Sequence, residues 1–151
     1  QEALQTAFKA GELTGDFIAV LPGQGPSANG MPELHKLTPP LTSLQNQGFN
    51  VALLTDGRMS GASGKFPAAL HVTPEAMHGG LIGKVRDGDL IRIDWSQNTL
   101  QLQVADTELE QRPAFELPPQ IQSLGRNLFA RARANVTAAD QGASFILQDL
   151  P

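Results

Sequence analysis

The sequence predicts a single domain of mixed α and β structure, with a compact β-barrel-like core and flanking helices. The chain has 151 residues, a length that suits one hydrophobic core. Short apolar runs with strand character recur along the whole chain, and the helical stripes between them are short. Because these segments are unevenly spaced, a barrel-like sheet fits them better than a regular series of βαβ units.

The N-terminal third is expected to alternate helices and strands. Residues 2–10 predict a helix, because apolar side chains recur there at helical spacing. Residues 16–21 and 49–54 predict strands, and the second is apolar enough to be buried on both faces. Two short helices are expected between these strands, at residues 32–37 and 41–47, with a pair of prolines separating them.

The rest of the chain predicts further strands and one clear helix. The strands are expected at residues 68–72, 90–95, 100–104 and 143–147. Trp95 alternates with isoleucines and is expected in the core. Thr73, Pro74 and Glu75 have the order of a helix start, with an acid in the first turn. Residues 124–136 predict a helix with an apolar stripe, whose arginines form a solvated face or a dimer contact.

Composition excludes several classes of protein. A net charge of −4 with no basic stripe argues against nucleic-acid binding. No apolar run approaches the ~20 residues that span a bilayer, so no membrane partner is expected. The sequence has no cysteine, so this chain can form neither a disulfide nor a cysteine-ligated zinc or iron–sulfur site. This composition fits a cytoplasmic protein.

A glycine-rich loop follows the strand at residues 49–54. It reads "TDGRMSGASGKF", residues 55–66, and contains three glycines, Arg58 and Lys65. Glycines let backbone N–H groups turn toward an anion, and carboxyl ends of strands are common ligand sites. The loop is therefore either an anion-binding loop or a solvated turn with incidental charges, and composition alone does not separate these alternatives.

Two standard phosphate motifs are excluded. A P-loop would need glycine and Ser/Thr where the chain has Met59 and Phe66. Residues 23–28 match the dinucleotide pattern G-x-G-x-x-A, but that motif must open a helix. Residues 29–32, Asn-Gly-Met-Pro, break the chain at that point.

Two longer blocks carry a family resemblance. "LTDGRMSGASGKFPAALHVTPEAMHGGLIGKVRDGDLIRID", residues 54–94, and "GPSANGMPELHKLTPPL", residues 25–41, resemble signatures of the dihydroxy-acid and phosphogluconate dehydratase family. The variants "GMPELHKL" and "SGASGK" are similar to the 6-phosphogluconate branch, whereas the amino-acid-biosynthesis branch carries a loop closer to S-G-G-T. The resemblance extends to about residue 147, so residues 1–151 are expected to be the family's C-terminal domain.

The resemblance implies partners and cofactors beyond this chain. A large N-terminal domain, absent here, would hold an iron–sulfur cluster (4Fe-4S) on three cysteines and most ligands of a Mg²⁺ ion. The implied core resembles the swivelling domain of aconitase-like enzymes, and the full-length protein is expected to be a homodimer. A helix at the first residues suggests a piece of a longer protein; a trimmed but complete small protein is the alternative.

The implied reaction is the dehydration of 6-phospho-D-gluconate to 2-keto-3-deoxy-6-phosphogluconate, a step of the Entner–Doudoroff pathway. The C2 proton is weakly acidic and the C3 hydroxyl leaves poorly, so magnesium and cluster iron are expected to assist. Ser60 matches the family serine that acts as base at C2. Gly57, Gly61 and Gly64, with the charge of Arg58, are expected to stabilise its hydroxylate.

The remaining site residues also follow from the resemblance. Glu33 matches a glutamate that ligates magnesium, which prefers carboxylate oxygen. The substrate phosphate and carboxylate are expected to contact Arg58, Ser63, Lys65, His35 and Lys36. Without the resemblance, Ser60 reads as a turn serine and Glu33 as an acid favoured by a helix dipole.

Three functions remain open at this level. The first is the C-terminal domain of a 6-phosphogluconate dehydratase, inactive alone. The second is a domain of a related dehydratase for an unphosphorylated dihydroxy or sugar acid. The third is a stand-alone module that holds an anion in the glycine loop, which tight binding of 6-phosphogluconate without metal would favour.

Overall fold

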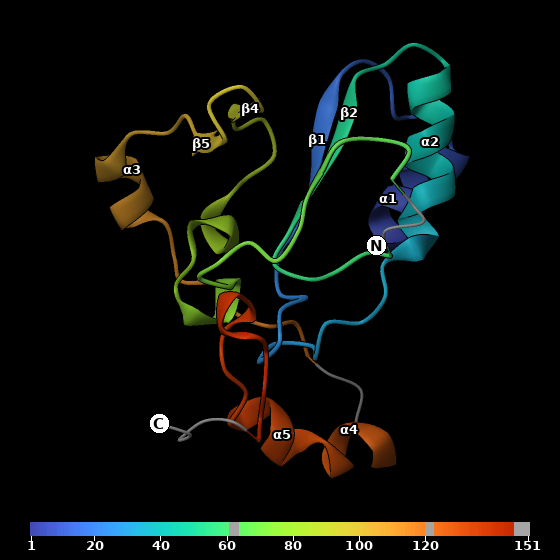
Figure 1. The fold of residues 1–151 in the computed structure, drawn as a ribbon. Coiled ribbons are helices and arrows are strands. Elements are labelled where there is room, and N and C mark those ends of the chain that lie inside the picture. Colours follow the sequence, from blue (N-terminus) through green and yellow to red (C-terminus); the bar gives the residue numbers. More distant parts are fainter. Residues whose placement is uncertain (61–63, 120–122, 147–151) are drawn as a thin grey trace.

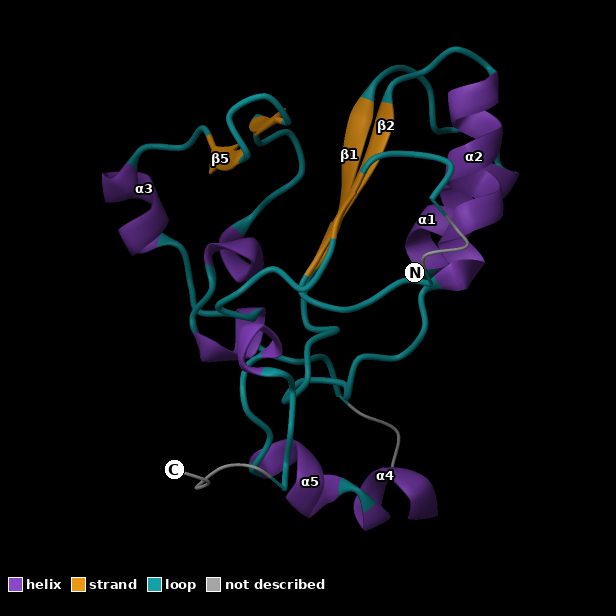
Figure 2. Cartoon of the chain, viewed as in Figure 1, coloured by secondary structure: helices purple, strands orange, loops and turns teal. Residues whose placement is uncertain are grey.

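The structure, a computed structural model, describes residues 1–60, 64–119 and 123–146 and shows mixed α and β structure (Figure 1, Figure 2). Its α-helices are α1 (Glu2–Lys9), α2 (Thr38–Asn46), α3 (Asp106–Gln111), α4 (Leu124–Leu128) and α5 (Ala130–Ala134). Its short 3-10 helices are η1 (His35–Leu37), η3 (Ala76–His78), η4 (Leu81–Lys84) and η5 (Ala139–Gln141). None of the helices in these ranges is long and apolar enough to cross a membrane.

The strands within the described residues form two separate sheets. β1 (Phe17–Leu21), β2 (Val51–Thr55) and β3 (Ala68–Ala69) make a parallel sheet in the order β1-β2-β3. β4 (Ile91–Asp94) and β5 (Thr99–Leu102) form the antiparallel hairpin that the sequence predicts, and Figure 1 shows it apart from the parallel sheet. The described ranges contain no closed barrel, so the barrel-like core is not confirmed.

The main core lies between the parallel sheet and α2. Leu41 from α2 belongs to the same buried cluster as Val51 and Leu53 of β2. Leu54 points to the other face of β2 and packs with Ile82 of η4 in a second cluster. All of β2 is buried, as its continuous apolar sequence predicts. Each buried leucine contributes roughly 2 kcal/mol to folding.

The parallel pairing of β1 and β2 places two loops at one edge of the sheet. The register pairs Leu21 with Thr55, so both strands end at the same level. The Thr55 hydroxyl donates to the Leu21 carbonyl at 2.7 Å and fixes this end. The loop at residues 22–30 and the loop that begins at Asp56 therefore leave the sheet side by side.

The prolines at residues 39 and 40 begin a helix instead of separating two helices. The sequence predicts helices at residues 32–37 and 41–47, whereas α2 runs from Thr38 with both prolines in its first turn. The N–H groups of a first turn have no helical partner, so proline loses no hydrogen bond there. Residues 35–37 form only η1.

Four expectations for the chain after residue 67 are wrong in detail. The helix predicted at residues 124–136 is divided between α4 and α5, with non-helical geometry at Phe129. Trp95 is exposed and is not part of the core. Residues 143–146 form no strand, and residue 147 lies outside the described residues. The strand predicted at 68–72 is reduced to β3.

Candidate active site

Glu33 connects two segments that the sequence places far apart. Its Oε1 accepts the backbone N–H of Ser60 at 2.8 Å, and its Oε2 lies 3.0 Å from the Arg58 Nη1. Arg58 also donates through Nε to the Met31 carbonyl at 2.7 Å. Glu33 and Arg58 form a parallel β-bridge, so the two backbones run side by side. The structure thus brings together the predicted metal ligand, the predicted base and one predicted substrate contact.

This cluster is open to a ligand. The side chain of Glu33 is 29% exposed and that of Arg58 is 49% exposed, and Ser60 is also exposed. A carboxylate has about four lone-pair positions, and Arg58 and Ser60 occupy at least two of them. Glu33 therefore fits the role of one hard oxygen ligand for a divalent cation. Among the described residues, no group of three or more acidic, histidine or cysteine side chains could hold a metal by itself.

Asp56 is a site residue that the sequence analysis missed. Its carboxylate is fully buried at the end of β2 and accepts three backbone hydrogen bonds. Oδ2 binds the N–H groups of Gly23, at 3.0 Å, and Ala76, at 2.9 Å, and Oδ1 binds that of Gln24 at 2.8 Å. Asp56 thereby joins three segments next to Arg58. An acid directly after a continuous apolar strand is the signal that could have indicated this role.

Glu75 organises the loop at residues 22–30, which Asp56 also binds. It is buried, and its carboxylate accepts the N–H groups of Ser27, at 3.0 Å, and Ala28, at 3.1 Å. A Cβ on Gly25 would lie 2.3 Å from the Glu75 Oε2, so a side chain there would displace this carboxylate. The prediction that Glu75 serves the first turn of a helix is therefore wrong, because its charge is used by the loop.

Arg126 of α4 extends this framework toward Glu33. It donates to the Asn29 Oδ1 at 3.0 Å and to the Ala28 carbonyl at 3.3 Å. Arg133 in turn donates to the Arg126 carbonyl at 2.7 Å. These two arginines were expected on a solvated face or at a dimer contact, but Arg126 holds residues 28–29, just before the segment that carries Glu33, and Arg133 holds Arg126.

Gly57 has a different role from the one predicted. Its N–H donates to the Thr55 Oγ1 at 3.0 Å, so this donor is already used within the loop. A Cβ at this position would lie 2.6 Å from the Gln24 Cβ, so glycine allows two loops to approach closely. The expected stabilisation of an anion by Gly57 is therefore wrong. Gly61 lies outside the described residues, and Gly64 is exposed.

The other predicted substrate contacts are more dispersed. His35 and Lys36 lie on η1, shortly after Glu33, and both are exposed. Lys65 is exposed and lines a shallow groove of about 500 Å³ along α2. Ser63 lies outside the described residues. The role of these four residues in substrate binding stays a prediction.

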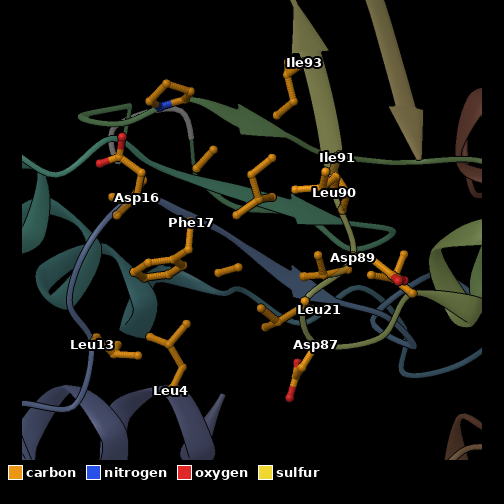
Figure 3. Close-up of a pocket in the computed structure, with 18 of the residues that line it drawn as sticks. Leu4, Leu13, Asp16, Phe17, Leu21, Asp87, Asp89, Leu90, Ile91 and Ile93 are labelled. Atoms are coloured by element: carbon orange, nitrogen blue, oxygen red, sulfur yellow. The ribbon is translucent and has the colours of Figure 1, made fainter. Parts of the chain in front are cut away.

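A larger groove lies away from this cluster, between β1 and β4. Its volume is about 1030 Å³, and Figure 3 shows Leu4, Phe17 and Ile91 among its walls. Its lining is mainly apolar and includes none of the predicted site residues. A sugar-acid phosphate needs charged and polar partners, so the chemistry of the Glu33 cluster suits such a substrate better.

Comparisons with known proteins identify the family of the chain. The family described as "Dihydroxy-acid/6-phosphogluconate dehydratase C-terminal" matches residues 1–143. A phosphogluconate dehydratase of Zymomonas mobilis is 55% identical over 143 residues, which cover 95% of this chain and 24% of that protein. One of Escherichia coli strain K12 is 50% identical over 148 residues, covering 97% and 24% respectively.

A more distant relative belongs to the other branch. A dihydroxy-acid dehydratase of Methanococcoides burtonii is 34% identical over 145 residues, which cover 95% of this chain and 25% of that protein. The chain thus spans about a quarter of the length of the relatives it matches. Since the family match covers nearly the whole sequence, the chain belongs to the dihydroxy-acid/6-phosphogluconate dehydratase family.

Proposed function

We propose that this chain is the C-terminal domain of a dehydratase that converts 6-phospho-D-gluconate to 2-keto-3-deoxy-6-phosphogluconate and water. Ser60 acts as the base at C2, and Glu33 supplies one ligand to magnesium. The substrate assignment is supported by higher identity to phosphogluconate dehydratases, 50–55%, than to the dihydroxy-acid dehydratase, 34%. The observation that carries the proposal is the 2.8 Å hydrogen bond between Glu33 and the backbone of Ser60.

This hydrogen bond matters because the base and the metal ligand must serve neighbouring substrate atoms. The proton to be removed is on C2, and the carboxylate that makes it acidic is on C1. Glu33 holds the main chain of Ser60 directly, which fixes the position of the base relative to the metal ligand. Magnesium and the iron–sulfur cluster, when bound, supply the electrophilic assistance that the C1 carboxylate and the C3 hydroxyl need.

The proposed chemistry at this chain's residues is a proton abstraction followed by elimination. Ser60, as the hydroxylate, takes the C2 proton and becomes a neutral hydroxyl, and the C3–O bond breaks with the hydroxyl leaving as hydroxide. Return of that proton from Ser60 to the hydroxide gives water and restores the hydroxylate. The enol formed between C2 and C3 then becomes the ketone. Arg58 is proposed to contact the substrate carboxylate, and Ser63, Lys65, His35 and Lys36 to contact the phosphate.

Other parts of the site are proposed to come from the rest of a longer protein. The relatives are about four times as long as this chain. A cysteine-free chain cannot ligate a 4Fe-4S cluster through thiolates, so the cluster and the other magnesium ligands would belong to the N-terminal domain. A cytoplasmic homodimer is proposed for the full-length enzyme.

The test uses the full-length protein with Ser60→Ala, assayed with 6-phosphogluconate and with an unphosphorylated dihydroxy acid. Ser96→Ala, in the turn of the β4–β5 hairpin, is the matched control. We expect Ser60→Ala to lower turnover of 6-phosphogluconate by about 10²–10⁴-fold with the cluster spectrum unchanged. Near-normal turnover would reject Ser60 as the base.

The same assay separates the alternatives. A wild-type preference for the unphosphorylated acid would assign the chain to a related dehydratase instead. Inactivity on both substrates, together with tight metal-independent binding of 6-phosphogluconate, would favour an anion-binding module.

A further inference from the structure

The end of the molecule formed by α4, α5 and the segment after them carries several exposed apolar side chains. The exposed fractions are 86% for Leu124, 71% for Leu128 and 58% for Phe129. Phe145 and Ile146 are also exposed, on a segment that a hydrogen bond between the Thr137 N–H and the Ser144 carbonyl returns toward α5 (Figure 1). Single exposed apolar residues are ordinary, but a group of this kind indicates an interaction surface.

The solvent-accessible surface of the chain is larger than that of a typical monomer of its mass. The chain exposes 9607 Å², whereas a monomer of 16.1 kDa typically exposes roughly 7,400 Å². The excess of about 2,200 Å² is larger than the roughly 800 Å² that one partner loses in a specific protein–protein interface of standard size.

The helices that carry these side chains contact the loop that leads to the candidate active site. Arg126, on α4, binds Asn29 and the Ala28 carbonyl. A Cβ at Gly30 would lie 3.9 Å from the Arg133 Cδ of α5. The helices therefore lie against residues 28–30, shortly before Glu33, and a large body packed on them would lie near this loop.

We propose that the face formed by Leu124, Leu128, Phe129, Phe145 and Ile146, here named the α4–α5 face, docks the N-terminal portion of the full-length polypeptide. About three-quarters of the length of the relatives lies outside this chain, which is ample to cover it. Glu33 alone cannot complete a metal site, and the missing ligands must arrive from a body beside it. This part of the argument, that metal ligands come from a second body, rests on the proposed function.

The chemistry of the face defines its partner. It consists of leucine, isoleucine and phenylalanine side chains, and Arg131 of α5 is an exposed charge on the same helix pair. The matching surface is therefore apolar with a carboxylate for Arg131. Docking there would remove the apolar side chains from water.

Photo-cross-linking in the full-length protein tests this assignment. The benzophenone amino acid p-benzoylphenylalanine replaces Phe129, which it resembles in shape, and in a second variant Phe145. The matched control carries it at Asn127, an exposed polar position on α4. Equal amounts of ¹⁴N- and ¹⁵N-labelled protein are mixed before irradiation, and the cross-linked peptides are identified by mass spectrometry.

We expect positions 129 and 145 to cross-link to peptides of the N-terminal portion within the same polypeptide, at least fivefold more than position 127. Mixed-isotope peptides would show that a second copy covers the face, and an absence of cross-links at both positions would show that it stays in water. Either result overturns the proposal. Cross-linking is measured without turnover, so its result does not depend on whether the proposed reaction is correct. Likewise, a negative cross-linking result would not change the outcome of the activity assay.

Discussion

The carboxylate of Glu33 accepts the backbone N–H of Ser60 at 2.8 Å, although 27 positions separate them in the sequence. The same carboxylate pairs with Arg58 at 3.0 Å. Because of this hydrogen bond, the position of the proposed base, Ser60, depends on the position and charge of the proposed metal ligand, Glu33. Changes at Glu33 should therefore affect metal binding and catalysis together.

Glu33→Gln in the full-length protein tests this coupling. The amide keeps an oxygen acceptor for the Ser60 N–H but loses the charge that attracts a divalent cation and Arg58. We expect magnesium affinity and turnover to fall together, each by at least about tenfold, in a titration of rate against magnesium. Glu2→Gln, on α1, is the control. Unchanged magnesium dependence would remove Glu33 from the metal site.

Asp56→Asn tests whether the buried Asp56 carboxylate stabilises the loop at residues 22–30. The substitution replaces one acceptor oxygen with an amide NH₂ group, which would face backbone N–H donors in a buried position. We expect the free energy of unfolding to fall by about 2 kcal/mol, measured by urea denaturation. Asp140→Asn, at an exposed position, should be close to neutral. Equal stability of the two variants would contradict the role given to Asp56.

Gly25→Ala tests the close approach of Glu75 to the loop at residues 22–30. The new methyl group would overlap the Glu75 carboxylate, which must shift away from the Ser27 and Ala28 N–H groups. We expect a loss of about 1–3 kcal/mol in stability. Gly125→Ala is the control, because nothing lies within 4 Å of a Cβ there. A Gly25→Ala protein as stable as that control would show that Glu75 does not depend on this contact.

Asp89 should make stability depend on pH in the acid range. The Arg112 guanidinium, followed by the Arg86 N–H, lowers the pKa of Asp89 from 3.8 to about 2. A carboxyl with a lowered folded pKa contributes stability above its unfolded pKa and loses it as pH falls toward the folded pKa. This contribution is therefore complete above about pH 4 and lost between about pH 4 and pH 2.

Urea unfolding at a series of pH values checks this assignment. Asp89→Asn should lower stability at neutral pH and flatten the profile between about pH 4 and pH 2. Asp87→Asn, two residues away and exposed, should leave the profile unchanged. An Asp89→Asn profile that keeps the wild-type slope in that window would assign the acid sensitivity to other groups.

The local parts of this fold could be predicted from the sequence. β2 is a continuous apolar run, and the β4–β5 hairpin has alternating apolar residues, so each is found close to its expected place. The role of the two prolines of α2 was predicted wrongly, because a proline can either end one helix or begin the next. Which of the two occurs depends on how the whole segment packs.

The contacts of the site were harder to predict. Asp56 meets Gly23 across 33 positions, and Glu75 meets Ala28 across 47. Such contacts depend on the parallel pairing of β1 with β2, which no local pattern contains. Gly57 was also hard to interpret from the sequence. Glycine is required at this position because the loop packs closely against Gln24, not because the loop binds an anion.

Release of deuterium from 6-phosphogluconate labelled at C2 tests the central claim most directly. It reports removal of the C2 proton, and it is compared between wild-type and Ser60→Ala full-length protein with equal cluster content. The account predicts that the substitution slows this release by at least about 100-fold. Release at the wild-type rate would show that another group takes the proton and would contradict the assignment of Ser60.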